Sequence, residues 1–106
     1  MRALITGSGN MGRAIASGLE ARGDEVVAMA GRETGYPAAT EVGAVDVTFE
    51  FSHDSTLLEH VDLGLGAGCR AFVVGTTGWT ADDETGLAFT ARLHEHGARA
   101  VVAPTY

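Results

Sequence analysis

The sequence contains no lysine, so all seven of its basic side chains are arginines. Within this chain, the absence excludes a lysine Schiff base and a lysine proton donor. A single cysteine, Cys69, excludes an internal disulfide and fits a reducing compartment such as the cytoplasm. We therefore expect a cytoplasmic protein in which Cys69 is a small buried apolar residue.

Long apolar runs and an excess of basic charge are also absent. No stretch approaches the roughly 18 residues of a membrane span, and no signal peptide is visible. The net charge of −7 argues against nucleic acid and against an anionic membrane as partners. Any phosphate group must then be held by local geometry, and we expect a small-molecule partner.

The composition, 45% hydrophobic and 20% charged, is typical of a soluble globular protein, and 106 residues suffice for one domain. Short apolar runs predict strands at 2–6, 25–30, 45–51, 71–75 and 99–103. Helical spacing predicts a helix at 10–22, with Met11, Ile15 and Leu19 on its packed face. Further helices are predicted from Ser52 to the glycines at 64–68, and from Thr80 to about His96. Residues 31–44 are expected to form a loop.

Strands that are short and continuously apolar are typical of parallel sheets covered on both faces. With right-handed crossovers, this order predicts an α/β fold. We expect a Rossmann-like, doubly wound parallel sheet of about five strands, with helices on both faces.

The turn after the first strand, Gly7-Ser8-Gly9-Asn10-Met11-Gly12, matches G-x-G-x-x-G between a strand and a helix. In such a motif Gly7 permits the tight turn, Gly9 lets a pyrophosphate approach the backbone, and Gly12 lets the helix pack closely. The helix N-terminus offers free N–H groups to the phosphates. The motif predicts a dinucleotide-binding domain over residues 1–106; the alternative is a glycine turn used only for packing.

Arg32 follows the second strand, twenty residues after Gly12. NAD-selective sites usually carry an acidic residue here to bind the ribose hydroxyls, whereas an arginine suits the 2′-phosphate of NADP. Arg32 therefore indicates that NADPH is accepted, with NADH as the other candidate cofactor. The alternative is a solvated arginine beside Glu33.

A further motif, Gly75-Thr76-Thr77, ends the fourth predicted strand at the same edge of the sheet. Its main-chain groups and two hydroxyls could hold an amide such as the nicotinamide carboxamide, with Trp79 as a wall. A β-turn followed by a Thr80 helix cap and a core Trp79 explains the residues equally well.

Four segments, "GSGNMG", "DVTFEFS", "VVGTTGW" and "VVAPTY", occur in an order that resembles the 4-hydroxy-tetrahydrodipicolinate (dihydrodipicolinate) reductase family of lysine biosynthesis. The resemblance covers the whole chain and implies an N-terminal domain that binds NADH or NADPH. It implies that the glycine loop holds the pyrophosphate and Arg32 the 2′-phosphate. The nicotinamide would meet Gly75-Thr76-Thr77 and Ala103-Pro104-Thr105-Tyr106, although Thr105 and Tyr106 replace the Asn and Phe common in the family.

The resemblance also implies hydride transfer from the nicotinamide to a cyclic unsaturated dicarboxylate. In that family the proton donor, the substrate-binding groups and the tetramer contacts lie in a second, C-terminal domain absent from this chain. We therefore assign no catalytic residue, and we expect residues 1–106 to bind cofactor without turnover and the full-length protein to be a homotetramer.

Two other functions stay open. "GSGNMGRAIASG" also resembles the start of pyrroline-5-carboxylate reductases, and a non-catalytic NAD(P)-sensing module would carry the same glycine motif. Among the histidines, His53 is expected to cap a helix or to be exposed, and contact with the cofactor or substrate is the alternative. His60 is expected on a solvated helix face, and His94, in line with Leu87 and Ala91, to be half-buried. We expect no metal site.

Overall fold

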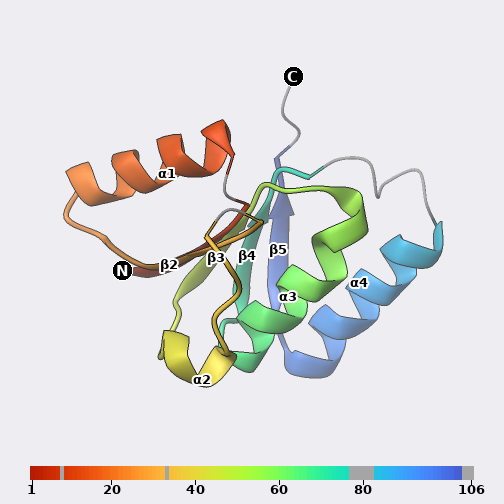
Figure 1. Cartoon of the computed structure of the whole chain (residues 1–106). Helices are drawn as coiled ribbons and strands as arrows, with labels where there is room; N and C mark the ends of the chain where they lie inside the picture. The colour runs from red at the N-terminus through yellow and green to blue at the C-terminus, as the bar shows by residue number, and fades with distance from the viewer. Residues whose placement is uncertain (8, 33, 77–82, 104–106) are drawn as a thin grey trace.

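The computed structural model describes residues 1–7, 9–32, 34–76 and 83–103. Within them, strands alternate with helices along the chain (Figure 1). The strands are β1 (Arg2–Thr6), β2 (Glu25–Ala30), β3 (Val47–Glu50), β4 (Ala71–Val74) and β5 (Arg99–Val102). The helices are α1 (Asn10–Ala21), α2 (Ala39–Val42), α3 (Leu57–Gly66) and α4 (Asp83–His96), and a 3₁₀ turn, η1 (Asp54–Thr56), precedes α3.

All five strands are parallel and lie in the order β2-β1-β3-β4-β5. Helix α1 covers one face of the sheet, and α3 and α4 cover the other (Figure 1). The predicted doubly wound, Rossmann-like α/β fold is confirmed. The chain leaves β1 toward β2 on one side and later returns to β3 on the other, so the topological switch point lies between β1 and β3.

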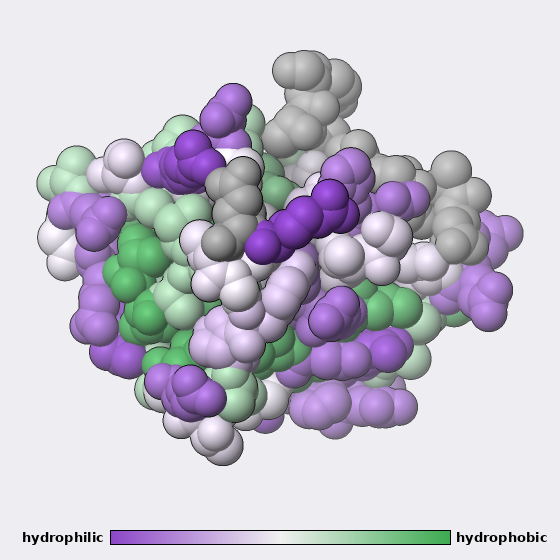
Figure 2. Space-filling view, in the orientation of Figure 1, coloured by the Kyte–Doolittle hydropathy of each residue, from purple (hydrophilic) through white to green (hydrophobic). Residues whose placement is uncertain are grey.

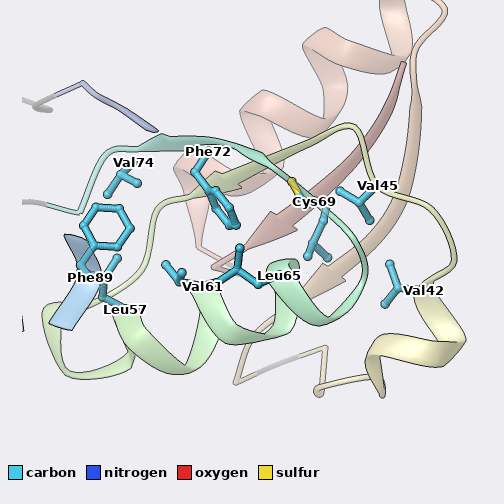
Figure 3. Close-up of a cluster of buried hydrophobic side chains, with 10 residues drawn as sticks. Val42, Val45, Leu57, Val61, Leu65, Cys69, Phe72, Val74 and Phe89 are labelled. Carbon is cyan, nitrogen blue, oxygen red and sulfur yellow. The ribbon is translucent and has the colours of Figure 1, made fainter. Parts of the chain in front are cut away.

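Each face of the sheet has its own apolar core. The larger core packs α3 and Phe89 of α4 against the sheet, and Figure 3 shows Val61 and Leu65 pointing from α3 toward Phe72 of β4. Cys69 belongs to this core and is fully buried, as predicted. The smaller core packs Ala16 and Leu19 of α1 against the opposite face. Burial on both faces is consistent with the mainly apolar side chains of the central strands β1 and β4.

Strand β3 carries polar side chains into the larger core. Successive side chains of a strand point to opposite faces, so Thr48 and Glu50 share the face that α3 covers. Both are fully buried. The Thr48 hydroxyl donates to Cys69 Sγ over 3.2 Å near the start of the strand. Glu50, at the carboxyl end, lies beside the candidate site.

Three local predictions were wrong. The region 31–44 contains a short helix, α2, whose Val42 is buried in the larger core. The helix expected to start at Ser52 begins at Leu57 after η1, because the Ser52 hydroxyl bonds to Glu50 and His60 rather than to a helix N–H. On α1, Met11 is 48% exposed and the buried positions are Gly12, Ala16 and Leu19.

The surface is mixed. In the view of Figure 2, hydrophilic and neutral residues cover most of the molecule, and hydrophobic residues show in small areas between them. None of the helices in the described part of the chain has the length and apolar character that crossing a membrane requires.

Candidate functional site

A pocket of about 400 Å³ opens at the carboxyl ends of β1, β2 and β3, at the switch point of the sheet. Ligands of doubly wound folds bind at this position because the loops diverge there and leave a crevice. The pocket is lined by Gly7, Gly9, Gly31, Arg32, Tyr36, Phe51, Ser52, His53, Thr56 and His60. Residues far apart in sequence thus meet at one edge of the sheet.

The end of β1 is shaped by glycines that contact backbone. Gly7 has φ of +117°, and a Cβ there would lie 2.2 Å from the Phe51 carbonyl oxygen. A Cβ on Gly12 would lie 2.2 Å from the Gly7 carbonyl oxygen. The Gly7 amide donates to the Ala30 carbonyl over 2.7 Å, so it continues the sheet and is not available to a ligand.

Gly9 differs from these two glycines, since nothing lies within 4 Å of where its Cβ would be. It is the N-cap of α1, and no side-chain hydrogen bond caps the helix in the part of the chain described. The first turn of α1 carries no acidic residue. The N-terminus of α1 therefore faces the pocket, with open space beside Gly9. The first N–H groups of a helix have no acceptor within the helix, so they can bind a ligand there. This arrangement suits an anion such as a pyrophosphate.

The end of β2 forms a closed turn. The amides of Gly31 and Gly35 each donate to the other's carbonyl, over 3.0 and 2.8 Å. Arg32 sits inside this turn, is exposed and lines the pocket. Tyr36 follows the turn at once and forms part of the same wall. Arg32 therefore lies after β2, and it lines the same pocket as Gly7 and Gly9.

The ends of β3 and β4 are joined by an aromatic ring. A Cβ on Gly75 would lie 2.1 Å from the Phe51 ring, so the ring packs on bare backbone. Met11, Phe51, Ser52 and Gly75 line a second, smaller pocket of about 120 Å³. Because the two pockets share Phe51 and Ser52, the site extends from the end of β2 to the end of β4.

Glu50 lies beneath this site, and its carboxylate accepts hydrogen bonds from several sides. Oε1 accepts from the hydroxyl of Ser52 and, over 3.3 Å, from that of Thr6. His60 Nδ1 lies 2.8 Å from the same oxygen. Oε2 accepts from the Thr76 hydroxyl. A buried carboxylate requires such partners, because its removal from water costs on the order of several kcal/mol.

His60 is 1% exposed, so the prediction of a solvated histidine was wrong. An ionised carboxylate has no hydrogen to donate, so Nδ1 is assigned as the donor to Glu50. On the other side of the ring, Nε2 lies 3.2 Å from the Tyr36 hydroxyl, and the two ring centroids are 5.4 Å apart. Through its two ring nitrogens, His60 therefore links Glu50, at the end of β3, to Tyr36, which follows the turn after β2.

The remaining predicted residues are placed as follows. Asn10 is exposed at the first position of α1. Thr76 is 5% exposed, and its hydroxyl donates to Glu50 and accepts from the Ser52 amide over 3.0 Å, so its side chain faces inward. The Ala103 amide donates to the Val74 carbonyl and extends β5, and Ala103 lines neither pocket. Predictions for the following residues lie outside the described residues: Ser8, Thr77, Trp79, Thr80, Pro104, Thr105 and Tyr106.

Two other histidine predictions can be compared with the structure. His53 is exposed, as expected, and lines the larger pocket. His94 is exposed, so the expectation of a half-buried residue was wrong. Phe89 and Leu93, four residues apart, form the buried face of α4, and Leu87 is 72% exposed on another face.

Glu50, His60 and Tyr36 were not predicted from the sequence as residues of the site. A signal for His60 was present, since it lies three residues after Leu57 and four before Gly64, both of which α3 buries. Glu50 alternates with Thr48, which by itself suggests a solvated strand face. Taken together, a polar strand face opposite a histidine on an otherwise buried helix face indicates a buried polar network.

A parallel sheet with a pocket at its switch point, beside a glycine turn and a helix N-terminus that no described side chain caps, defines a dinucleotide-binding domain. A model of the family described as "Dihydrodipicolinate reductase, N-terminus" matches residues 1–106, and the chain belongs to this family. It is thus an NAD(P)-binding domain of a reductase-type oxidoreductase. A search of curated proteins finds no match.

Proposed function

We propose that residues 1–106 bind NADPH or NADH across the strand-end site and present the nicotinamide for reduction of 4-hydroxy-tetrahydrodipicolinate in lysine biosynthesis. The observation that carries the proposal is the pocket of about 400 Å³ beside the glycine turn, in a chain of this family. The match over the whole chain favours this reductase over pyrroline-5-carboxylate reductase. When bound, the cofactor supplies the hydride.

Each part of the site suits one part of the cofactor. The open space at Gly9 and the first N–H groups of α1, at Asn10 and Met11, suit the pyrophosphate. In doubly wound folds the residue after β2 contacts the adenosine ribose, which puts the adenosine half beside Arg32. The nicotinamide half then extends toward Gly75 and Thr76. The family resemblance adds Ala103-Pro104-Thr105-Tyr106 to the residues proposed to contact the nicotinamide.

The residues of this chain orient the cofactor and exclude water from one side of it. We assign the proton donor and the substrate-binding groups to none of them. In the proposal these groups come from a second domain, in a cytoplasmic homotetramer. The chain by itself is then expected to bind cofactor without turnover, and reductase activity of purified residues 1–106 would contradict this.

Titration of the protein with NADPH and NADH tests the cofactor assignment. We expect Arg32→Ala to weaken NADPH about 10- to 100-fold, because a charge-assisted bond to phosphate contributes about 1.5–3 kcal/mol. NADH should weaken less than about threefold, since it lacks the 2′-phosphate. An equal loss for both cofactors would refute the 2′-phosphate role.

Arg99→Ala is the matched control for this titration. Arg99 is an exposed arginine at the first position of β5, and therefore at the opposite edge of the sheet. Its replacement changes the net charge by the same amount as Arg32→Ala. An effect of long-range charge alone would weaken NADPH in both variants, whereas a local contact affects Arg32→Ala alone.

A further inference from the structure

A buried acid and histidine lie directly beneath the candidate cofactor site. The Glu50 side chain is fully buried and that of His60 is 1% exposed. Stability alone does not account for such a pair, because well-packed apolar residues in place of buried charged pairs are often equally or more stabilising. The position of the pair, at the carboxyl end of β3 with His60 lining the pocket, points to a role in the site.

On the adenosine side, the pair holds Tyr36. His60 Nε2 lies 3.2 Å from the Tyr36 hydroxyl, and the Tyr36 ring stands beside the His60 ring at a tilt of 31°. Tyr36 directly follows Gly35, whose two bonds to Gly31 close the turn that carries Arg32. A fixed Tyr36 therefore fixes one end of the Arg32 turn. Tyr36 is 48% exposed, so its ring remains open to a ligand in the pocket.

On the nicotinamide side, the same carboxylate holds Thr76. The Thr76 hydroxyl donates to Glu50 Oε2 and accepts from the Ser52 amide, and the Gly75 amide donates to the Glu50 carbonyl over 2.8 Å. The chain after β4 is thus bonded to the chain after β3 by side chain and main chain. One carboxylate contacts both sides of the site through its two oxygens.

We infer that Glu50 and His60 are positioning residues that fix both walls of the cofactor site at once, Tyr36 on the adenosine side and Thr76 on the nicotinamide side. The inference rests on the proposed function, because it assigns the two walls to the two halves of the cofactor. Neither Glu50 nor His60 needs to touch the reacting atoms.

Two probes separate the two walls. NADPH occupies both halves of the site, whereas 2′,5′-ADP carries only the adenosine half with its 2′-phosphate. A change on the adenosine wall should weaken both probes by the same factor. A change on the nicotinamide wall should weaken NADPH and leave 2′,5′-ADP unchanged. Dissociation constants come from calorimetry for 2′,5′-ADP and from cofactor fluorescence for NADPH.

Tyr36→Phe and His60→Asn test the adenosine wall. Phenylalanine keeps the ring and removes the hydroxyl, and the asparagine amide keeps a donor near the Nδ1 position while removing Nε2. Loss of one such hydrogen bond corresponds to about a three- to tenfold change. We expect this loss for both probes in each variant. The double variant should lose no more than either single variant, because the two changes break the same contact.

Thr76→Val tests the nicotinamide wall, and Glu50→Gln tests the carboxylate that contacts both walls. Valine keeps the shape of threonine without the hydroxyl, so NADPH should weaken about three- to tenfold while 2′,5′-ADP stays within about twofold. Glu50→Gln should weaken 2′,5′-ADP and weaken NADPH more, because the carboxylate contacts both walls. Glu59→Gln, an exposed acid on the same helix as His60, is the matched control and should change neither constant.

The outcomes distinguish failure of the positioning role from failure of the proposed cofactor-binding function. If the unchanged protein binds neither probe, the proposed function fails. If it binds both and Tyr36→Phe and His60→Asn leave 2′,5′-ADP unchanged, the positioning role fails and the function stands. Circular dichroism and thermal unfolding report the fold of each variant. If His60→Asn does not fold, Tyr36→Phe and Thr76→Val decide, since each removes one hydroxyl.

Discussion

The ends of β1 and β3 contact each other at the same edge of the sheet, yet they form the site by different means. At the end of β1, Gly7 and Gly12 bring backbone against backbone, and Gly9 leaves open space. At the end of β3, Glu50 and Ser52 fill the interior with hydrogen-bonded side chains. The two regions meet where a Cβ on Gly7 would strike the Phe51 carbonyl oxygen at 2.2 Å.

The difference implies opposite sensitivities to mutation. A backbone surface loses its shape when an atom is added, because main-chain atoms cannot move aside without disturbing the sheet. A polar network loses its shape when a polar atom is removed, because the partners left behind are buried without a bond. Additions at the end of β1 and removals at the end of β3 therefore test the comparison from its two sides.

The largest effect is expected for Gly12→Ala. The added Cβ would lie 2.2 Å from the Gly7 carbonyl oxygen, a backbone atom in the turn that follows β1. We expect a loss of about 3 kcal/mol in the free energy of unfolding, at the upper end for overpacking, together with loss of cofactor binding. Urea denaturation measures the first, and NADPH titration the second.

Gly9→Ala is the control within the same turn. Nothing lies within 4 Å of its added Cβ, so the free energy of unfolding should change by less than about 0.5 kcal/mol. The methyl group would occupy the space proposed for the pyrophosphate, and NADPH should weaken at least about tenfold. Unchanged NADPH affinity in Gly9→Ala would show that the phosphates bind elsewhere.

Glu50→Gln gives the next largest effect and tests the other side of the comparison. The amide group cannot accept from all the donors that face the carboxylate, so a hydroxyl of Thr6, Ser52 or Thr76 loses its bond. We expect the free energy of unfolding to fall by about 2 kcal/mol, measured by urea denaturation. Glu59→Gln should leave it unchanged, and an equal loss in both variants would contradict the role of burial.

The sequence predicted the fold and the glycine turn because both depend on local patterns. Short apolar runs identified all five strands, and the spacing of Gly7, Gly9 and Gly12 placed the turn between a strand and a helix. The end of β1 is formed by one short segment, so its geometry can be predicted from neighbouring residues.

The network at the end of β3 could not be predicted in the same way. It joins Glu50, His60, Thr76 and Tyr36 from four separate segments, and their contacts exist only once β2, β3 and β4 end at one edge. The contact made at Gly75 also depends on a residue distant in sequence. The sequence left open whether the bare backbone serves a ligand or a turn, and in the structure it accommodates the Phe51 ring beside the smaller pocket.

Gly75→Ala should have an intermediate effect that separates contact with a side chain from contact with backbone. Its Cβ would lie 2.1 Å from the Phe51 ring, which can rotate or shift, unlike the carbonyl that Gly12 faces. We expect a loss of about 1–2 kcal/mol in the free energy of unfolding. In a Phe51→Leu background the same change should cost less, because the ring is gone. If the losses in stability from Gly75→Ala and Phe51→Leu were additive, the Phe51 ring would not be the reason that position 75 requires glycine.

A small gain in stability, in place of a loss, is expected for Gly18→Ala. Gly18 lies in α1, six residues after Gly12, but it is exposed, and nothing lies within 4 Å of the position that a Cβ would take. The open space shows that packing on the sheet does not require a glycine at this position. Alanine should therefore raise the free energy of unfolding by about 0.5–1 kcal/mol, the difference in helix propensity, with NADPH affinity unchanged. Gly12→Ala and Gly18→Ala, made in one helix, would then change stability in opposite directions. If both destabilised the protein, the cost at Gly12 would reflect the helix in general and not its backbone contact with Gly7.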